Sequence, residues 1–90
     1  MWTILEKKSI QNVLRKTPRE ILVWYEAWKR IVELEGPRGL KLIKGFHDEP
    51  LKGEWKGFRS SRLGDQWRVI YKVHKDCLEV FVFQINPHKY

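Results

Sequence analysis

Two neighbouring segments near the C-terminus constrain the fold of this chain most strongly. Residues 66–74 alternate with a period of two, with aromatic and β-branched residues on one side and Arg68 on the other. Residues 77–85 are almost continuously apolar, which is typical of a central strand covered on both faces. The short turn between these segments predicts an antiparallel pair of strands.

A long helix is the best-marked element of the N-terminal half. Thr17–Glu20 reads Thr-Pro-Arg-Glu, which predicts a capping box with threonine as the N-cap and proline at the first helical position. Apolar residues at helical spacing continue to Gly36, which with the next proline predicts the end of the helix. We interpret this stripe as core. A shorter amphipathic helix over residues 6–15 precedes it, so an αα-hairpin is expected.

The remaining segments complete the fold prediction. A short strand at residues 2–5, a loop over residues 36–50 and a strand at residues 56–63 give the order β-α-α-β-β-β. This order predicts one α+β domain over residues 1–90, in which the helical hairpin packs on one face of a twisted, mostly antiparallel four-stranded sheet. The face that carries Arg68 is then expected to be open.

The charge of the chain indicates a polyanionic partner. The net charge is +7, and eleven Lys or Arg against six Asp or Glu follow Gly36. Nucleic acid is the simplest such partner, although a basic half can also be only a soluble surface. No apolar run reaches membrane-spanning length and no signal peptide is visible, so a cytoplasmic protein without a membrane partner is expected.

Several kinds of site find no support in the sequence. His47, His74, Cys77 and His88 are scattered without ligand-type spacing, so no metal is expected. No glycine-rich phosphate loop opens a helix, so no nucleotide or other cofactor is expected. No G-x-S-x-G motif is present, so a serine nucleophile of that kind is not expected either.

The residues that could carry chemistry lie between Glu49 and Val73 and at the C-terminus. An arginine within a strong β pattern suits a phosphate site because guanidinium is a planar, permanently charged fork. A solvated sheet face explains the same arginine, a loop ion pair explains Glu49 with Lys52, and a frayed tail explains the last residues. The candidates are Glu49, Lys52, Arg62, Arg68, His88 and Tyr90.

This constellation resembles the RelE/ParE superfamily of bacterial toxin–antitoxin toxins, in particular the YoeB- and YafQ-like ribosome-dependent mRNA interferases. The resemblance is strong from Glu49 to Tyr71 and elsewhere covers element order and size. Two departures stand out, since Lys89 separates a His-Tyr pair that is adjacent in YoeB-like toxins, and only His47 loosely matches the YafQ histidines. The matching residues are Glu49-Pro50-Leu51-Lys52, Gly57-Phe58, Ser61-Arg62, Arg68-Val69-Ile70-Tyr71, His88 and Tyr90.

The resemblance implies metal-independent cleavage of mRNA in the ribosomal A site by attack of the ribose 2′-hydroxyl on the adjacent phosphate. Glu49 then corresponds to the general base, Arg68 to the phosphate ligand and His88 to the general acid. Tyr90 would orient a base, and Lys52 would add positive charge near the phosphate. The residues expected to bind RNA through their charge are Lys56, Arg59, Arg62 and Lys72.

The resemblance also implies partners. These are a separately encoded cognate antitoxin, the mRNA and the 30S rRNA, with operator DNA bound by the toxin–antitoxin complex through the antitoxin. The antitoxin is expected to cover the basic face or the apolar residues of the long helix that lie off its stripe, Leu22, Val23 and Leu34. A ParE-like gyrase inhibitor, or a catalytically inactive binding module of the same fold, remains the alternative. Glu49, Arg68 and His88 speak against it, because a gyrase binder does not need them.

Overall fold

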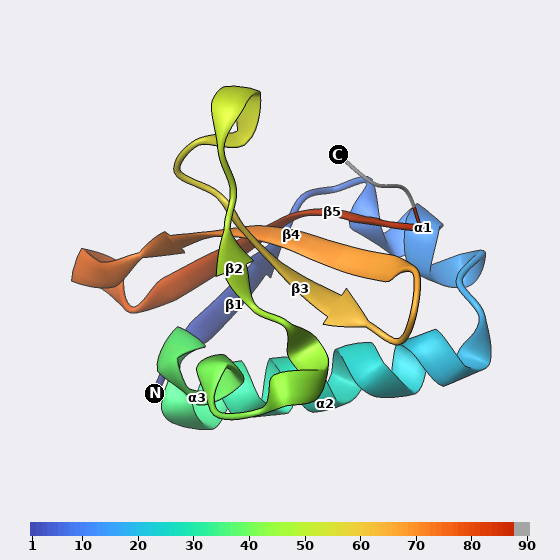
Figure 1. The fold of residues 1–90 in the computed structure, drawn as a ribbon, viewed down its shortest axis with the longest axis horizontal. Helices are drawn as coiled ribbons and strands as arrows, with labels where there is room; N and C mark the ends of the chain where they lie inside the picture. The colour runs from blue at the N-terminus through green and yellow to red at the C-terminus, as the bar shows by residue number, and fades with distance from the viewer. Residues whose placement is uncertain (88–90) are drawn as a thin grey trace.

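The computed structural model describes residues 1–87 and shows a twisted sheet with the long helix lying across one of its faces (Figure 1). Three short 3-10 turns, at Lys44–Phe46, Gly53–Trp55 and Lys75–Cys77, interrupt the connections. The main elements are β1 (Thr3–Glu6), α1 (Ile10–Arg15), α2 (Arg19–Glu35), α3 (Pro37–Lys41), β2 (Glu49–Pro50), β3 (Arg59–Leu63), β4 (Trp67–His74) and β5 (Glu79–Asn86).

The sheet confirms the predicted α+β class and the antiparallel pair near the C-terminus. Its strand order is β1-β5-β4-β3-β2, in which β1 runs parallel to β5 and every other pair is antiparallel. The sheet has five strands and not the predicted four. The additional strand, β2, consists of Glu49 and Pro50 only, which is too short to produce an alternating pattern.

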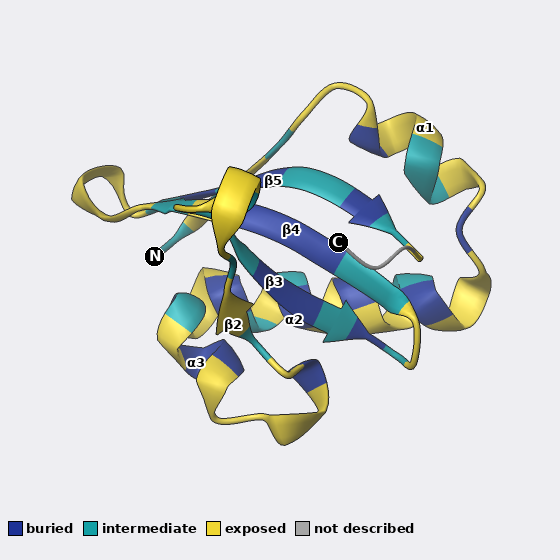
Figure 2. Ribbon diagram, turned by 45° about the horizontal axis from the view of Figure 1, so that its top comes forward, coloured by how far each residue is buried: buried dark blue, intermediate teal, exposed yellow. Residues whose placement is uncertain are grey.

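The apolar stripe of α2 is core, as predicted, except that Trp24 is exposed. Its buried residues recur at spacings of four, three and four, so they form one helical face. Figure 2 shows that the buried side of α2 is turned toward the sheet, in which β4 is buried along its middle. Trp28, which is fully buried, donates a hydrogen bond from Nε1 to Ser61 Oγ at 3.0 Å and stacks edge-on against Tyr71. The buried residues of this face are Ile21, Tyr25, Trp28 and Val32.

The long helix ends at Glu35 and is capped by Gly36 with a φ of 74°, as predicted, but the starts of the helices differ from the prediction. Pro18 occupies the N-cap of α2, and the Thr17 hydroxyl instead donates a hydrogen bond to the Val13 carbonyl at 2.7 Å, at the end of α1. Helix α1 begins at Ile10, because the chain before it forms β1. Pro37 opens α3 within the predicted loop, since a proline at the first helical position loses no helical hydrogen bond.

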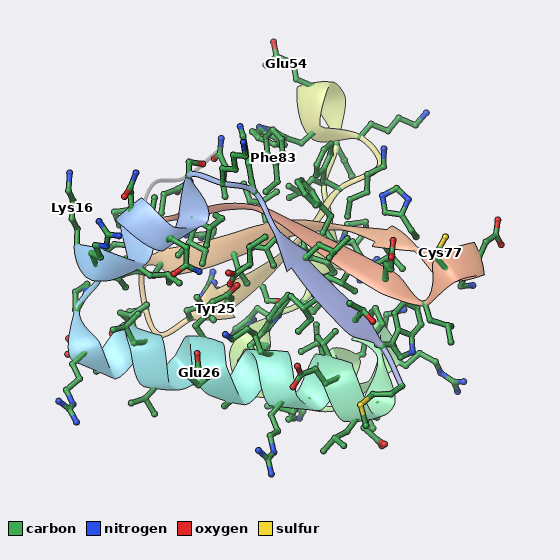
Figure 3. The ribbon with its side chains drawn as sticks, turned by 180° about the vertical axis from the view of Figure 1, so that it is seen from behind. Lys16, Tyr25, Glu26, Glu54, Cys77 and Phe83 are labelled. Atoms are coloured by element: carbon green, nitrogen blue, oxygen red, sulfur yellow. The ribbon has the colours of Figure 1, made fainter. Side chains whose placement is uncertain are left out.

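The sheet face opposite α2, here called the outer face, is only partly open. The pairing of β4 with β5 shifts after Ile70, which leaves Phe83 as an extra, bulged residue. The Phe83 ring lies 5.3 Å from that of Phe58 and 5.8 Å from that of Trp55, both in the loop over residues 51–58. Figure 3 shows Phe83 near the base of this raised loop, with Glu54 at its tip. The face is therefore less open than predicted, since Ile70 is fully buried on it and Arg68 is half-buried.

No helix within residues 1–87 is both long enough and apolar enough to span a membrane.

Candidate functional site

The strand register brings three of the predicted site residues onto the outer face. Arg62 pairs with Arg68, and Arg68 pairs in turn with Asn86. Glu49 pairs with Ser60, two residues before Arg62 on β3. Because paired residues and residues two apart share a face, Glu49, Arg62 and Arg68 lie on the same side of the sheet.

The spacing of these residues suits a phosphate group between a carboxylate and a guanidinium. Glu49 on β2 and Arg68 on β4 are separated by two inter-strand spacings across the sheet and by two residues along the strand direction. Their Cα atoms are therefore about 12 Å apart. Both side chains are long enough to reach toward the middle of that interval. Nη1 of Arg68 donates a hydrogen bond to the Gln66 carbonyl at 3.0 Å, which holds the guanidinium near the start of β4.

Two amide side chains extend this polar region, and the sequence analysis missed them. Asn86 Nδ2 donates to Gln84 Oε1 at 2.9 Å, and both residues pair with β4 on the outer face. They alternate with the buried Ile85. This alternation indicates that Gln84 and Asn86 face away from the core, but the apolar residues in the rest of β5 obscured it.

The other predicted residues are more widely distributed. Lys52 and Lys56 are exposed on the raised loop, and Lys72 lies on the outer face with its Nζ 5.4 Å from the centre of the Phe58 ring. His88 and Tyr90 lie outside the described residues. Within residues 1–87, no group of three or more His, Cys, Asp or Glu side chains is placed to hold a metal ion.

A buried carboxylate that the sequence analysis did not single out fixes the start of β2. The Asp48 side chain is 0% exposed and accepts hydrogen bonds from Arg59 Nε at 3.1 Å and Arg59 Nη2 at 2.8 Å. It also accepts hydrogen bonds from Ser61 Oγ at 2.7 Å and from the Tyr71 hydroxyl. Since side chains alternate along a strand, the inward position of Asp48 turns Glu49 toward the outer face.

The same network determines the position of Arg59. This residue pairs with Tyr71, whose side chain belongs to the core, so Arg59 lies on the helix side of the sheet and not beside Arg68. Its side chain is 22% exposed and forms an ion pair with Asp48. Its predicted interaction with RNA would therefore have to occur away from the outer face.

Two buried tyrosines should resist ionisation. Burial, followed by the negative charge of Asp48, raises the pKa of Tyr71 far above the ordinary tyrosine value, and burial with a hydrogen bond to Glu6 does the same for the pKa of Tyr25. The folded state then holds both protons more tightly than the unfolded state. This stabilisation is fully present below the unfolded pKa of about 10 and is lost as the pH rises above it.

We therefore expect two of the three tyrosines to ionise only as the protein unfolds in alkali. Tyrosinate absorbance followed together with far-ultraviolet circular dichroism checks this. Ionisation of all three tyrosines near pH 10, with unchanged circular dichroism, would show that the two buried hydroxyls are not held as described.

Comparison with known proteins identifies the fold. No protein-family model and no curated protein matches the chain. Among solved structures, the archaeal RelE–RelB complex from Pyrococcus horikoshii OT3 gives a TM-score of 0.75 at 23% identity, over 96% of this chain and 93% of that chain. A YoeB/ParE toxin from Agrobacterium tumefaciens gives 0.73 at 18% identity, over 97% and 99%.

The E. coli DinJ–YafQ complex gives a TM-score of 0.73 at 17% identity, over 98% of this chain and 94% of that chain. At these identities the likeness concerns the fold. The chain therefore has the fold of the RelE, YoeB and YafQ toxins over nearly its whole length.

Proposed function

We propose that this chain is the toxin of a type II toxin–antitoxin system and that it cleaves mRNA on the ribosome as a metal-independent endoribonuclease. The observation that carries the proposal is the common placement of Glu49, Arg62 and Arg68 on the outer face. The fold shared with toxins of this kind supports it. Folding alone does not require a carboxylate and two arginines on the same side of a sheet.

The proposed reaction divides proton transfer and charge stabilisation between these residues. Glu49 takes the proton from a ribose 2′-hydroxyl, whose oxygen forms a bond to the adjacent phosphorus while the bond to the 5′-oxygen breaks. His88 donates a proton to the leaving 5′-oxygen, and Tyr90 orients a neighbouring base. Arg68 and Arg62 offer fixed positive charge where the phosphate gathers negative charge. The products are a 2′,3′-cyclic phosphate and a 5′-hydroxyl.

The proposed partners follow from the same reading. The mRNA and the 30S rRNA supply the phosphates, and a cognate antitoxin holds the toxin inactive in the cytoplasm. The solved complexes of RelE with RelB and of YafQ with DinJ support such a partner. The complex would bind operator DNA through the antitoxin.

The outlying lysines should govern the salt dependence of ribosome binding. Lys52, Lys56 and Lys72 are exposed and can reach phosphates of the RNA. Contacts to phosphates do not depend on the nucleotide sequence. The slope of log affinity against log salt is negative. Replacing Lys56 and Lys72 by glutamine should make it less steep by about 0.7 to 0.9 for each phosphate that is no longer neutralised. Ribosome co-sedimentation at several salt concentrations measures this slope.

A matched variant with Lys29 and Arg30 replaced by glutamine serves as the control. These cations lie on α2, on the opposite side of the sheet. An unchanged slope in the lysine variant, together with a reduced slope in the control, would move the ribosome-binding surface to the helices.

Primer extension on mRNA from cells that express the chain tests the proposed function. Cuts in phase with codons are expected from an mRNA interferase. DNA damage with intact mRNA would instead identify a ParE-like gyrase inhibitor, the rival that the YoeB/ParE structural neighbour keeps open.

A further inference from the structure

A second basic site lies at the far end of β4 from Arg68. It is a pocket of about 440 Å³, within the usual range for binding sites. Val73 lines it and lies five residues beyond Arg68, which places the two Cα atoms about 17 Å apart. Figures 1 and 2 show that the N-terminus, α3 and the β4–β5 turn gather at this end of the molecule, while β5 ends at the other.

The charge of this pocket is positive. Arg38 and Lys41 reach it from α3, Lys75 from the β4–β5 turn and Arg59 from β3, and none of the residues that line it is acidic. Asp48 offsets the charge of Arg59. The other three cations are exposed and form no salt bridge within residues 1–87. Glu35 shares a neighbouring pocket with Arg38 but does not line this one.

The walls of the pocket are apolar and preformed. Trp2, Pro37 and Val73 supply them, and all three are half-buried. The backbone N–H of Trp2 donates to the Glu33 carbonyl at 3.1 Å. Its indole packs so closely on Gly36 that a Cβ atom there would lie 2.5 Å from Nε1, so the ring has little room to move.

Two exposed leucines lie close to residues that line the pocket. Leu42 is 82% exposed and shares the neighbouring pocket with Arg38. Leu78 is 46% exposed, and its carbonyl accepts a hydrogen bond from Thr3, next to Trp2. Apolar surface beside a charged pocket fits a protein partner better than a nucleic acid, because protein–nucleic acid interfaces are more polar.

We propose that this pocket binds a segment of a partner protein in which carboxylates flank an apolar side chain. The apolar side chain enters between Trp2 and Val73, and the carboxylates meet Arg38, Lys41 and Lys75. The identity of this partner as the antitoxin rests on the proposed function, whereas the site itself does not. Neither Glu49 nor Arg68 lines the pocket, so we expect substitutions that weaken binding here to leave cleavage by the free chain unchanged.

Nuclear magnetic resonance of the isotope-labelled chain, titrated with a synthetic peptide of alternating aspartate and leucine, tests the site. We expect shifts at the Trp2 indole and at the backbone of Arg38, Lys41 and Lys75. The variant Arg38→Glu with Lys41→Glu should bind about tenfold more weakly, or about 1.4 kcal/mol. The variant Arg15→Glu with Lys16→Glu makes the same charge change on α1 and should bind the peptide as the wild type does.

The absence of shifts at millimolar peptide, or equal weakening by both variants, would overturn the proposal. So would stronger shifts at the pocket with oligouridine than with the peptide, since the site would then bind RNA. Circular dichroism checks the fold of each variant. Lys75→Glu tests the opposite side of the pocket if the double variant fails to fold.

Cleavage of mRNA in a translation reaction separates this inference from the proposed function. The Arg38→Glu, Lys41→Glu variant should cut at the wild-type rate, and loss of cutting in the folded variant would assign the pocket to the nuclease site and overturn the inference. A wild-type chain that binds the peptide at the pocket but cuts no mRNA would refute the proposed function. The inference that the pocket binds a protein segment would be unaffected.

Discussion

Replacing Arg68 by alanine should lower mRNA cleavage by about two to three orders of magnitude, the usual cost of removing one donor that stabilises a developing oxyanion. Arg68 lies on the outer face and contacts the Gln66 carbonyl, so its removal should leave the core intact. Single-turnover cleavage on programmed ribosomes measures the loss, and thermal unfolding followed by circular dichroism measures the stability.

Two further variants make this result specific. Arg68→Lys keeps the charge but loses the planar fork, so it should restore only part of the rate. Arg15→Ala removes an exposed cation from α1 and should cut normally. A folded Arg68→Ala variant that still cuts at the wild-type rate would remove Arg68 from the site.

Replacing Asp48 by alanine should lower the free energy of unfolding by about 3 kcal/mol, because it removes the buried partner of an ion pair and leaves polar groups without an acceptor. Arg59, Ser61 and Tyr71 all donate hydrogen bonds to this carboxylate. Asp48→Asn should cost less, since an amide oxygen still accepts hydrogen bonds from the two hydroxyls. Chemical denaturation measures both values.

An exposed aspartate provides the control for this experiment. Asp76→Ala, in the turn after β4, should change stability by less than about 0.5 kcal/mol. Equal effects at Asp48 and Asp76 would show that the buried network contributes nothing beyond an ordinary surface charge. Because Asp48 directly precedes Glu49, we also expect Asp48→Ala to slow cleavage at temperatures where the variant is still folded.

The elements predicted most clearly from the sequence are those with a long, repeated pattern. The alternation of β4 and the spacing along α2 each extend over several residues, so both elements follow from local preference. β2 is too short for any pattern. Pro37 follows the end of α2, as predicted, but proline is equally suited to the first turn of a helix, and here it also opens α3.

The site could be predicted only where one residue contradicts its local pattern. Arg68 is conspicuous as a cation within a strong β pattern, and the register then placed it with Glu49 and Arg62. Asp48 gives no such signal, because its burial depends on partners that lie 11, 13 and 23 residues away along the chain. The bulge at Phe83 likewise arises from pairing between strands and not from either strand alone.

Mapping of RNA ends in a purified translation system tests the central claim most directly. The wild-type chain should cut mRNA when ribosomes are present and leave a 2′,3′-cyclic phosphate on the upstream fragment. Glu49→Gln and Arg68→Ala should leave the mRNA whole under the same conditions. Intact mRNA at wild-type concentrations that arrest translation would contradict the account, as would equal cutting by the wild type and both variants.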